Sequence, residues 1–316
     1  MTGSSPATAL HIQTPLLACR GLPPGSSPRV RLKMECDQPS GSFKIRGIGH
    51  LCQRLHAEGV ARLVSSSGGN AGFAAAYAAH KLSVPISVIV PGTTSQAAIQ
   101  RLREVNADVV VHGDDWDTAD RAARELVDRE GAGYVPPFDH PLIWRGNSTL
   151  VDELAVQGER PDAVVVAVGG GGLFSGVALG MERAGWSDVP IVAVGAEGAD
   201  ALDQSIRAGR LVTLPGIGSI AKSLGARTVA QAAFDWQSRR PVSSVVVSDR
   251  SALNACKRFA DEHQTLVEPA CGAALSLVYD QHDAIAGFGD IVVVICGGIG
   301  VTTGLLQAWD AQLQAG

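Results

Sequence analysis

The sequence is poor in several features that mark common functional classes. Aromatic residues make up 5% of the chain, which is too few for a base-stacking surface. The formal net charge of −5 gives no general attraction to nucleic acid. No apolar run approaches the roughly 20 residues that a membrane-spanning helix needs, and no basic segment precedes an apolar one near the N-terminus, as in a secretory signal. We therefore expect no nucleic-acid partner and no membrane partner.

The cysteines also lack the spacing of a metal or disulfide framework. The six are Cys19, Cys36, Cys52, Cys256, Cys271 and Cys296. They form no CxxC pair and are scattered through a long chain, so we expect reduced thiols and a cytoplasmic location. The histidines are isolated, and the sequence therefore predicts no zinc site.

The chain is rich in apolar residues and glycine, at 46% hydrophobic residues and 37 glycines, which predicts an ordered protein with a sizeable core. Predicted strands are 29–36, 60–66, 85–90, 108–112, 163–168, 190–194, 243–247 and 290–295. Predicted helices are 43–58, 71–81, 95–105, 116–129, 147–157, 173–184, 249–262, 270–281 and 302–313. This alternation is typical of an α/β fold with open, mostly parallel sheets and flanking helices.

Two segments interrupt this alternation. Three prolines within residues 136–141 exclude regular structure there, and we expect a domain crossing close to them. Residues 209–226 read as a loop-rich piece. Strand 29–36 alternates polar and apolar residues, which predicts that one of its faces is exposed to solvent.

Lysine is rare, with five in the chain against 21 arginines, and Lys44 stands in an unusual place. Pro39 and Gly41 favour a turn before it, and Ser42 is a candidate helix N-cap. A lysine in the first helical turn faces the positive end of the helix dipole, which destabilises its protonated form. Taken alone, a lysine is most often a solvated surface residue.

Three strands run into glycine-containing turns that precede helices. The segment Gly169–Gly172 lets backbone amides wrap an anion at a helix N-terminus, which suits a cofactor phosphate. A packing turn is an equal alternative, and a dinucleotide site is another, with Glu197 as a ribose-binding acid. Residues 67–70 (SGGN) suit a carboxylate or form a plain helix cap. Cys296 ends the third strand, either as a small buried residue or as a neutral partner of a pyridine ring.

Seven motifs occur in one order that covers most of the chain. They are PSGSFKIRG (39–47), SSGGNAG (66–72), PPFDHPLIW (136–144), VGGGGL (168–173), AKSLGA (221–226), LVEPACGAAL (266–275) and VVVICGG (292–298). In them the chain resembles the serine/threonine dehydratase family, enzymes that depend on pyridoxal 5′-phosphate (PLP), and within it the serine dehydratase and serine dehydratase-like branch. The resemblance implies the tryptophan-synthase-β-like fold, PLP fold type II. It places 1–38 and 142–316 in a large PLP-binding domain and 39–141 in a small inserted α/β domain, and it implies a homodimer.

The resemblance also implies a role for each matching residue. Lys44 would hold PLP as a Schiff base, Phe43 would pack on its ring, Asn70 would bond its 3′-oxygen, and Cys296 would face its ring nitrogen. The residues that would cup the phosphate are Gly169, Gly170, Gly171, Gly172 and Leu173. The residues that would receive the substrate are Ser67, Gly68, Gly69 and Ala71 at its carboxylate, with Phe138 at its border.

The implied activity is an L-serine/L-threonine ammonia-lyase, a PLP-dependent carbon–oxygen lyase that gives pyruvate or 2-oxobutanoate plus ammonia. Lys44 would remove the α-proton before the β-hydroxyl leaves. A thiol at the ring nitrogen would not keep it protonated, which favours elimination over racemisation. The alternatives are a PLP-dependent lyase for another β-substituted or D-/β-hydroxy amino acid, a nucleotide-binding oxidoreductase, and a catalytically silent PLP-binding protein.

The family also implies a monovalent cation, potassium. Its ligands would be backbone carbonyls of Gly169, Ala199, Leu224 and Ala226. The chain departs from the pattern at Gly195, where this branch carries a glutamate that helps to hold the cation. Glu197 lies two residues away and is the alternative carboxylate. The chain also departs after Cys296, where it reads GGIGVT.

Overall fold

The computed structural model describes residues 8–23, 25 and 27–315, and the chain divides into two compact units. Unit 1 contains Gln38–Gly146 and the described residues up to Ile12. Unit 2 contains Gln13–Asp37 and the described residues from Asn147 onward. The family resemblance implies an inserted domain at 39–141. Unit 1 differs from this range at the N-terminal segment, and also at helix α5 (Pro141–Asn147), most of which belongs to unit 1.

Unit 1 is built on a four-stranded parallel sheet. Its strand order is β5-β4-β3-β6, and each neighbouring pair is parallel. The strands are β3 (Leu63–Ser65), β4 (Ile86–Val90), β5 (Asp108–Val111) and β6 (Gly133–Tyr134). The helices are α1 (Lys44–Ala57), α2 (Asn70–Leu82), α3 (Gln96–Glu104) and α4 (Trp116–Glu130).

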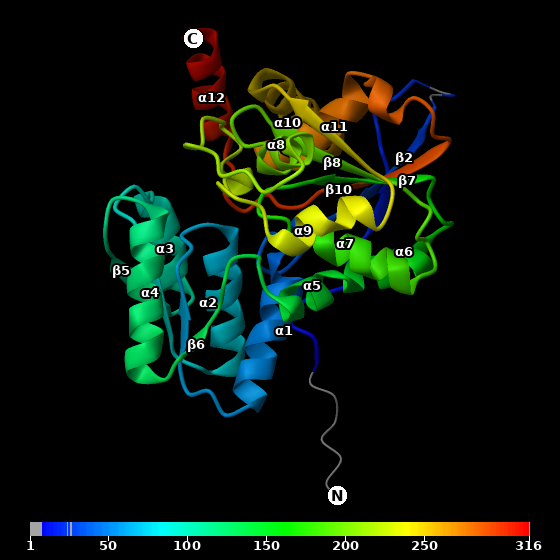
Figure 1. Ribbon diagram of the computed structural model, residues 1–316. Helices are drawn as coiled ribbons and strands as arrows, with labels where there is room; N and C mark the ends of the chain where they lie inside the picture. The colour runs from blue at the N-terminus through cyan, green and yellow to red at the C-terminus, as the bar shows by residue number, and fades with distance from the viewer. Residues whose placement is uncertain (1–7, 24, 26, 316) are drawn as a thin grey trace, which may run out of the picture. The chain divides into compact units, whose positions relative to one another are not determined.

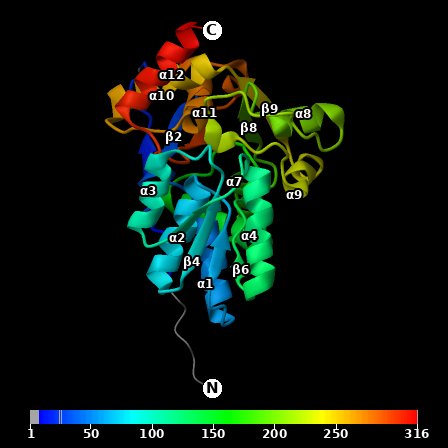
Figure 2. The same ribbon diagram turned by 90° about the vertical axis from the view of Figure 1, so that its left-hand side faces the viewer.

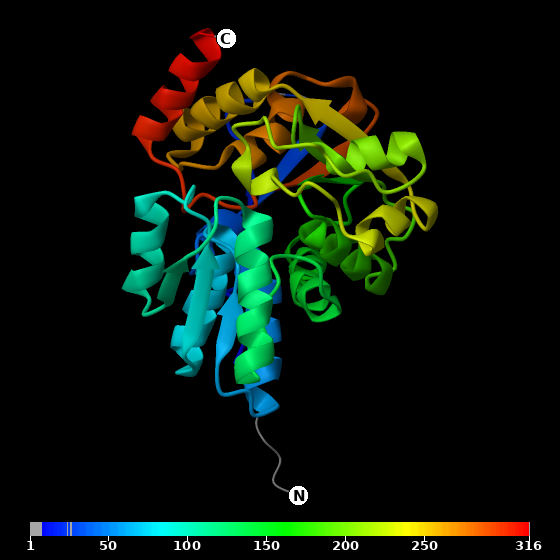
Figure 3. The same ribbon diagram turned by 60° about the vertical axis from the view of Figure 1, so that its left-hand side comes forward.

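Alternation along the strands of unit 1 decides which helices cover each face. Leu63 and Val88 point into a core shared with α1, α2 and α3, whereas their neighbours Val64 and Ile89 pack against α4. Successive residues of a strand face opposite sides, so one strand serves both cores. Figure 2 shows α1 and α2 beside this sheet, and in Figure 3 the teal helix α4 lies in front of its strands.

Unit 2 is built on a six-stranded sheet in the order β1-β2-β10-β7-β8-β9. Only β1 is antiparallel to its neighbour among these described strands. The strands are β1 (Leu16–Ala18), β2 (Arg29–Lys33), β7 (Ala163–Ala167), β8 (Ile191–Ala196), β9 (Val242–Val247) and β10 (Asp290–Val294).

The helices of unit 2 form layers on its sheet. Figure 1 shows α6 and α7 below the sheet and α10 and α11 above it. Helix α11 packs directly on β10, β7 and β8, and α10 packs on α11. The helices are α6 (Thr149–Gln157), α7 (Gly172–Arg183), α8 (Ala201–Ala208), α9 (Gln231–Asp235), α10 (Asp249–His263), α11 (Pro269–Tyr279) and α12 (Thr303–Ala315). In the described residues, no helix combines the length and apolar character needed to cross a membrane.

The prediction of a half-exposed strand at 29–36 is wrong. Lys33 is 0% exposed and Arg31 is 9% exposed. Lys33 Nζ donates to the Thr14 carbonyl at 2.8 Å and pairs with the Glu153 carboxylate. Arg31 Nε donates to Asp290 Oδ1 at 2.9 Å. Basic side chains can be buried when they are paired with a carboxylate and hydrogen-bonded. The alternation of polar and apolar residues in this strand therefore does not show which of its faces is exposed to solvent.

Several short elements were not predicted from the sequence. Strand β1 and helices α5, α8 and α9 have three to eight residues each, which leaves little room for a periodic pattern. The long predicted elements all occur, within a few residues at their ends. Ser95 caps α3, because its hydroxyl accepts from the Ala98 amide at 3.2 Å.

Candidate functional site

Lys44 is the first residue of α1, within the first helical turn as predicted. Gly41 allows the turn before it with a φ of +67°. Lys44 Nζ donates to the Pro137 carbonyl at 2.6 Å. It lies 5.2 Å from the centre of the Phe43 ring and 6.0 Å from that of Phe138. The half-buried amine therefore lies near two aromatic rings of unit 1 that are far apart in sequence.

The predicted cap of α1 is wrong. The residue before the helix is Phe43, which has helical dihedral angles and provides no side-chain cap. The Ser42 hydroxyl is buried and has no hydrogen-bond partner among the described residues. The turn at Gly41 brings Ser42 inside the protein, so sequence spacing alone misplaced the start of the helix by one residue.

The 67–70 loop connects β3 to α2 in unit 1. A Cβ at Gly72 would lie 1.6 Å from the Ser67 carbonyl oxygen, and a Cβ at Gly68 would lie 2.6 Å from Thr94 Cγ2. The loop thus folds closely over the first turn of α2 only because glycine stands at these positions. Gly69 precedes the helix, which has no side-chain cap there, so its first amides keep the capacity to bind an anion.

The glycine turn of unit 2, residues 169–172, connects β7 to α7. Gly171 precedes the helix with a φ of +92°, and no side chain caps the helix. A Cβ at Gly171 would lie 2.3 Å from Ala233 Cβ, and one at Gly169 would lie 2.9 Å from Leu224 Cα. Side chains are therefore excluded from this turn by packing.

The carbonyls of the glycine turn have donors within unit 2. The Gly170 carbonyl accepts from the Ala230 amide at 3.0 Å, and the Gly172 carbonyl accepts from Asn147 Nδ2 at 2.9 Å. The amides of Gly172 and Leu173 belong to the first turn of α7, where no intrahelical acceptor exists. Fixed carbonyls and available amides make this turn a fitting receptor for a phosphate. Asn147 was not predicted from the sequence, because its side chain donates to a carbonyl that lies 25 residues further along the chain.

Cys296 follows β10, and its sulfur lies 3.4 Å from that of Cys271 at the start of α11. Cys271 Sγ in turn donates to the Gly297 carbonyl at 3.0 Å. The hydrogen bond with Cys271, together with burial, raises the pKa of Cys296 well above its usual value. Cys296 is therefore a neutral thiol. All six cysteines are free, and Cys271 is fully buried.

The carbonyls expected around a cation all lie in unit 2. Gly169 touches the Leu224 backbone, and a Cβ at Gly195 would lie 3.5 Å from the Ala199 carbonyl oxygen. The Ala226 amide donates to the Leu224 carbonyl at 2.8 Å. Gly195 is buried within β8, whereas Glu197 follows the strand and is exposed. Within the described residues, no group of three or more His, Cys, Asp or Glu side chains could hold a metal ion.

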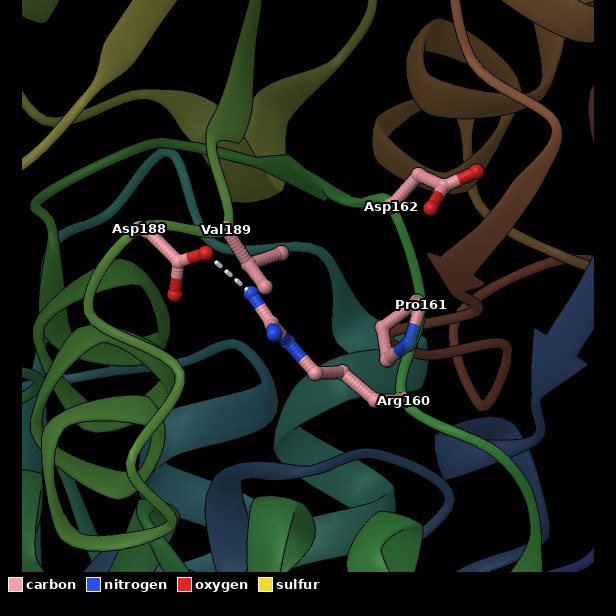
Figure 4. Close-up of a pocket in the computed structure, with 5 residues that line it drawn as sticks. All are labelled: Arg160, Pro161, Asp162, Asp188 and Val189. Atoms are coloured by element: carbon pink, nitrogen blue, oxygen red, sulfur yellow. Dashed lines mark hydrogen bonds and ion pairs between the residues drawn. The ribbon is translucent and has the colours of Figure 1, made fainter.

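A surface hollow of about 400 Å³ in unit 2 is lined by none of these residues. It is lined by Arg160, Pro161, Asp162, Asp188 and Val189, and Figure 4 shows the ion pair between Arg160 and Asp188. These residues precede β7 and β8, at the amino ends of the two strands. Open parallel sheets bind ligands at the carboxyl ends of their strands, so this hollow is not part of the candidate site.

Comparison with known proteins gives consistent matches along the whole chain. The family model described as "Pyridoxal-phosphate dependent enzyme" matches residues 7–297. A human protein named "Serine dehydratase-like" is 47% identical over 312 residues, covering 96% of this chain and 95% of the relative. A bovine "L-serine dehydratase/L-threonine deaminase" is 46% identical, with 96% of each chain covered. The crystal structure of a fungal L-serine ammonia-lyase from Rhizomucor miehei has a TM-score of 0.91 at 38% identity, covering 96% of this chain and 99% of the other.

Proposed function

The chain belongs to the family of pyridoxal-phosphate-dependent enzymes, and we propose from this premise that it is an L-serine/L-threonine ammonia-lyase. It would convert the hydroxy amino acid to pyruvate or 2-oxobutanoate and ammonia. The observation that carries the proposal is Lys44, an amine placed at a helix start beside the rings of Phe43 and Phe138. The relatives named for this activity, aligned over nearly the whole chain, support the choice of reaction.

The residues present fit PLP. Lys44 would supply the amine that attaches the cofactor, and Phe43 would pack on its ring. The amides of residues 169–173 would hold the phosphate, because the packing around Gly171 excludes a side chain from that turn. Asn70 would donate to the 3′-oxygen, and Cys296 would face the ring nitrogen as a neutral thiol. When bound, the cofactor supplies the electron sink that makes the α-proton of the amino acid acidic.

The substrate contacts come from unit 1. The amides of Ser67, Gly68, Gly69 and Ala71 hold the substrate carboxylate at the uncapped start of α2. Phe138 borders the substrate, and its backbone is fixed because its carbonyl accepts from Trp144 Nε1 at 2.9 Å. These contacts orient the α-carbon toward Lys44, whose amine removes the α-proton as a general base. The β-hydroxyl would leave together with a proton as water, so that the α-proton and the hydroxyl are lost as one water molecule. The aminoacrylate released would tautomerise to an imine, and a second water would hydrolyse this imine to the keto acid and ammonia.

A monovalent cation completes the proposed site. Carbonyls of Gly169, Ala199, Leu224 and Ala226 would hold potassium, a hard cation that prefers oxygen ligands. Gly195 supplies no carboxylate, so we expect weaker binding than in relatives with a glutamate there. Activity measured in potassium chloride and in tetramethylammonium chloride at equal ionic strength tests this. Equal activity in both salts would remove potassium from the proposal.

The proposed enzyme is a cytoplasmic homodimer. The free cysteines, four of them buried, support a reducing compartment. The resemblance to the serine dehydratase branch supports the dimer. Light scattering of the purified protein measures the dimer directly, and a molar mass of one 32.7 kDa chain would contradict it.

A keto-acid assay over a panel of amino acids tests the function. The panel includes L-serine, L-threonine, their D-enantiomers and other β-substituted amino acids. We expect a yellow protein that forms keto acid from L-serine or L-threonine. Borohydride should bleach the colour and leave the cofactor mass on the peptide that contains Lys44.

Each other outcome identifies an alternative. Turnover only with another amino acid would indicate a different lyase. A yellow protein without turnover on the whole panel would indicate a silent PLP-binding protein. A colourless protein that binds NAD would indicate an oxidoreductase.

A further inference from the structure

The buried carboxylate of Asp120 in unit 1 contacts the residue that precedes the proposed substrate loop, and no role has been assigned to it so far. Asp120 lies on α4 and is 8% exposed. Its Oδ1 accepts hydrogen bonds from the hydroxyls of Ser66 and Tyr134, and its Oδ2 accepts from Arg124 Nε at 2.8 Å. Four polar groups are thus joined through a single side chain.

The two hydroxyl donors stand at the bases of two loops with proposed functions. Ser66 is fully buried and immediately precedes the 67–70 loop. Tyr134 ends β6 and precedes the segment that contains Pro137 and Phe138. The Pro137 carbonyl accepts from Lys44 Nζ at 2.6 Å. Asp120 therefore ties the loop for the substrate carboxylate to the segment that contacts the lysine.

The negative charge of Asp120 in this network is paired with the positive charge of Arg124. Arg124 lies over the Tyr134 ring at 4.3 Å and offsets the charge of Asp120. Burial by itself raises the pKa of Asp120, but the hydrogen bonds from Ser66, Tyr134 and Arg124 outweigh it and leave the pKa below its usual value. Asp120 is therefore ionised at neutral pH, and charged acceptors make the stronger hydrogen bonds.

We propose that Asp120 is a positioning residue for the reaction, which sets the geometry of the 67–70 loop through Ser66 and that of the Pro137–Phe138 segment through Tyr134. The proposal rests on the proposed function, because it assigns the substrate carboxylate to the 67–70 loop. A loop held by a charged acceptor at its base presents its amides in one geometry to the carboxylate. The residue acts on binding rather than on proton transfer, because its hydrogen bonds join Ser66, Tyr134 and Arg124, which anchor loops and carry no proton to the substrate.

Asp120→Asn in the PLP-loaded enzyme tests the proposal, since it keeps the shape and removes the charge. We expect KM for L-serine to rise by about tenfold, with kcat falling by less than about threefold, because the lost interaction serves substrate binding. Tyr134→Phe removes one donor and should raise KM by a smaller factor. Asp128→Asn on the same helix changes an exposed residue and should leave both constants unchanged.

A second measurement works without turnover. Amide hydrogen exchange of peptides covering residues 66–72 and 134–140 should be faster in Asp120→Asn than in the wild type and in Asp128→Asn. An unchanged KM together with unchanged exchange, in a wild type that turns over L-serine, would overturn the positioning role. A wild type with no lyase activity would refute the proposed function instead, and the exchange result would still decide whether Asp120 orders the two loops.

Discussion

The two units of the chain supply different kinds of chemical group for the proposed reaction. Unit 1 contributes side chains, with the Lys44 amine 5.2 Å from the centre of the Phe43 ring and 6.0 Å from that of the Phe138 ring. Unit 2 contributes mainly backbone, at a turn where Gly171 has no room for a Cβ. The difference predicts opposite mutational sensitivities. In unit 1, removing a functional group should abolish activity. In unit 2, adding an atom at the glycine turn should weaken cofactor binding and folding stability.

The largest effect should come from removing the amine of unit 1. We expect Lys44→Ala to lower kcat by about 10⁴-fold or more, because the general base and the cofactor attachment are lost together. The keto-acid assay and the absorbance of the lysine-bound cofactor measure this. Lys81→Ala changes an exposed lysine of the same unit and should keep full activity. Activity retained in Lys44→Ala would break the assignment of side-chain chemistry to unit 1.

A lysine of unit 2 should behave differently, because its role is structural. Lys33 Nζ pairs with Glu153 and donates to Gln157 Oε1 at 2.8 Å. Lys33→Met should lower the free energy of unfolding by about 3–5 kcal/mol, since the mostly buried Glu153 carboxylate loses its ion pair with Lys33. The folded variant should keep its kcat. Lys257→Met, at a more exposed pair with Asp310, should cost at most about 1 kcal/mol, and chemical denaturation compares the two.

The glycine turn of unit 2 should respond to a single added methyl group. Gly171→Ala combines a left-handed backbone with a 2.3 Å contact to Ala233 Cβ, so we expect a loss of about 2–4 kcal/mol in folding stability and weaker PLP binding. Gly185→Ala is the matched control, because Gly185 has a φ of +75° and open space around its Cβ. It should cost only about 1–2 kcal/mol from backbone strain. Equal PLP affinity in the two variants would contradict the role of the turn.

The smallest effect is a pH dependence within unit 1. The folded-state pKa of Asp120 lies below its usual value of 3.8, so its contribution to stability is present above that value and is lost as pH falls through the folded-state pKa. The stability difference between the wild type and Asp120→Asn should be about 1–2 kcal/mol at pH 7 and shrink below pH of about 3.8. Denaturant unfolding at several pH values measures it. A difference that stays constant with pH would show that the charge of Asp120 adds nothing.

Strong local signals predicted much of the fold. The glycine turns and the apolar strands before them located β3, β7 and β10 correctly, since both features act over a few residues. The burial of strand β2 could not be predicted, because Glu153 and Asp290, the acidic partners of Lys33 and Arg31, lie more than 100 residues away. Ser42 was misplaced for the same reason, since the interior of unit 1 decides where its hydroxyl points.

The sequence by itself determined the family motifs, the lysine at a helix start and the glycine turn, because each depends on neighbouring residues. Only the tertiary structure showed that Asn147 holds the Gly172 carbonyl, that Cys271 contacts Cys296, and that Asp120 joins Ser66 to Tyr134. These pairings bring together atoms from separate strands and helices. The spacing of residues along the chain does not predict such contacts, because they form only when the chain folds.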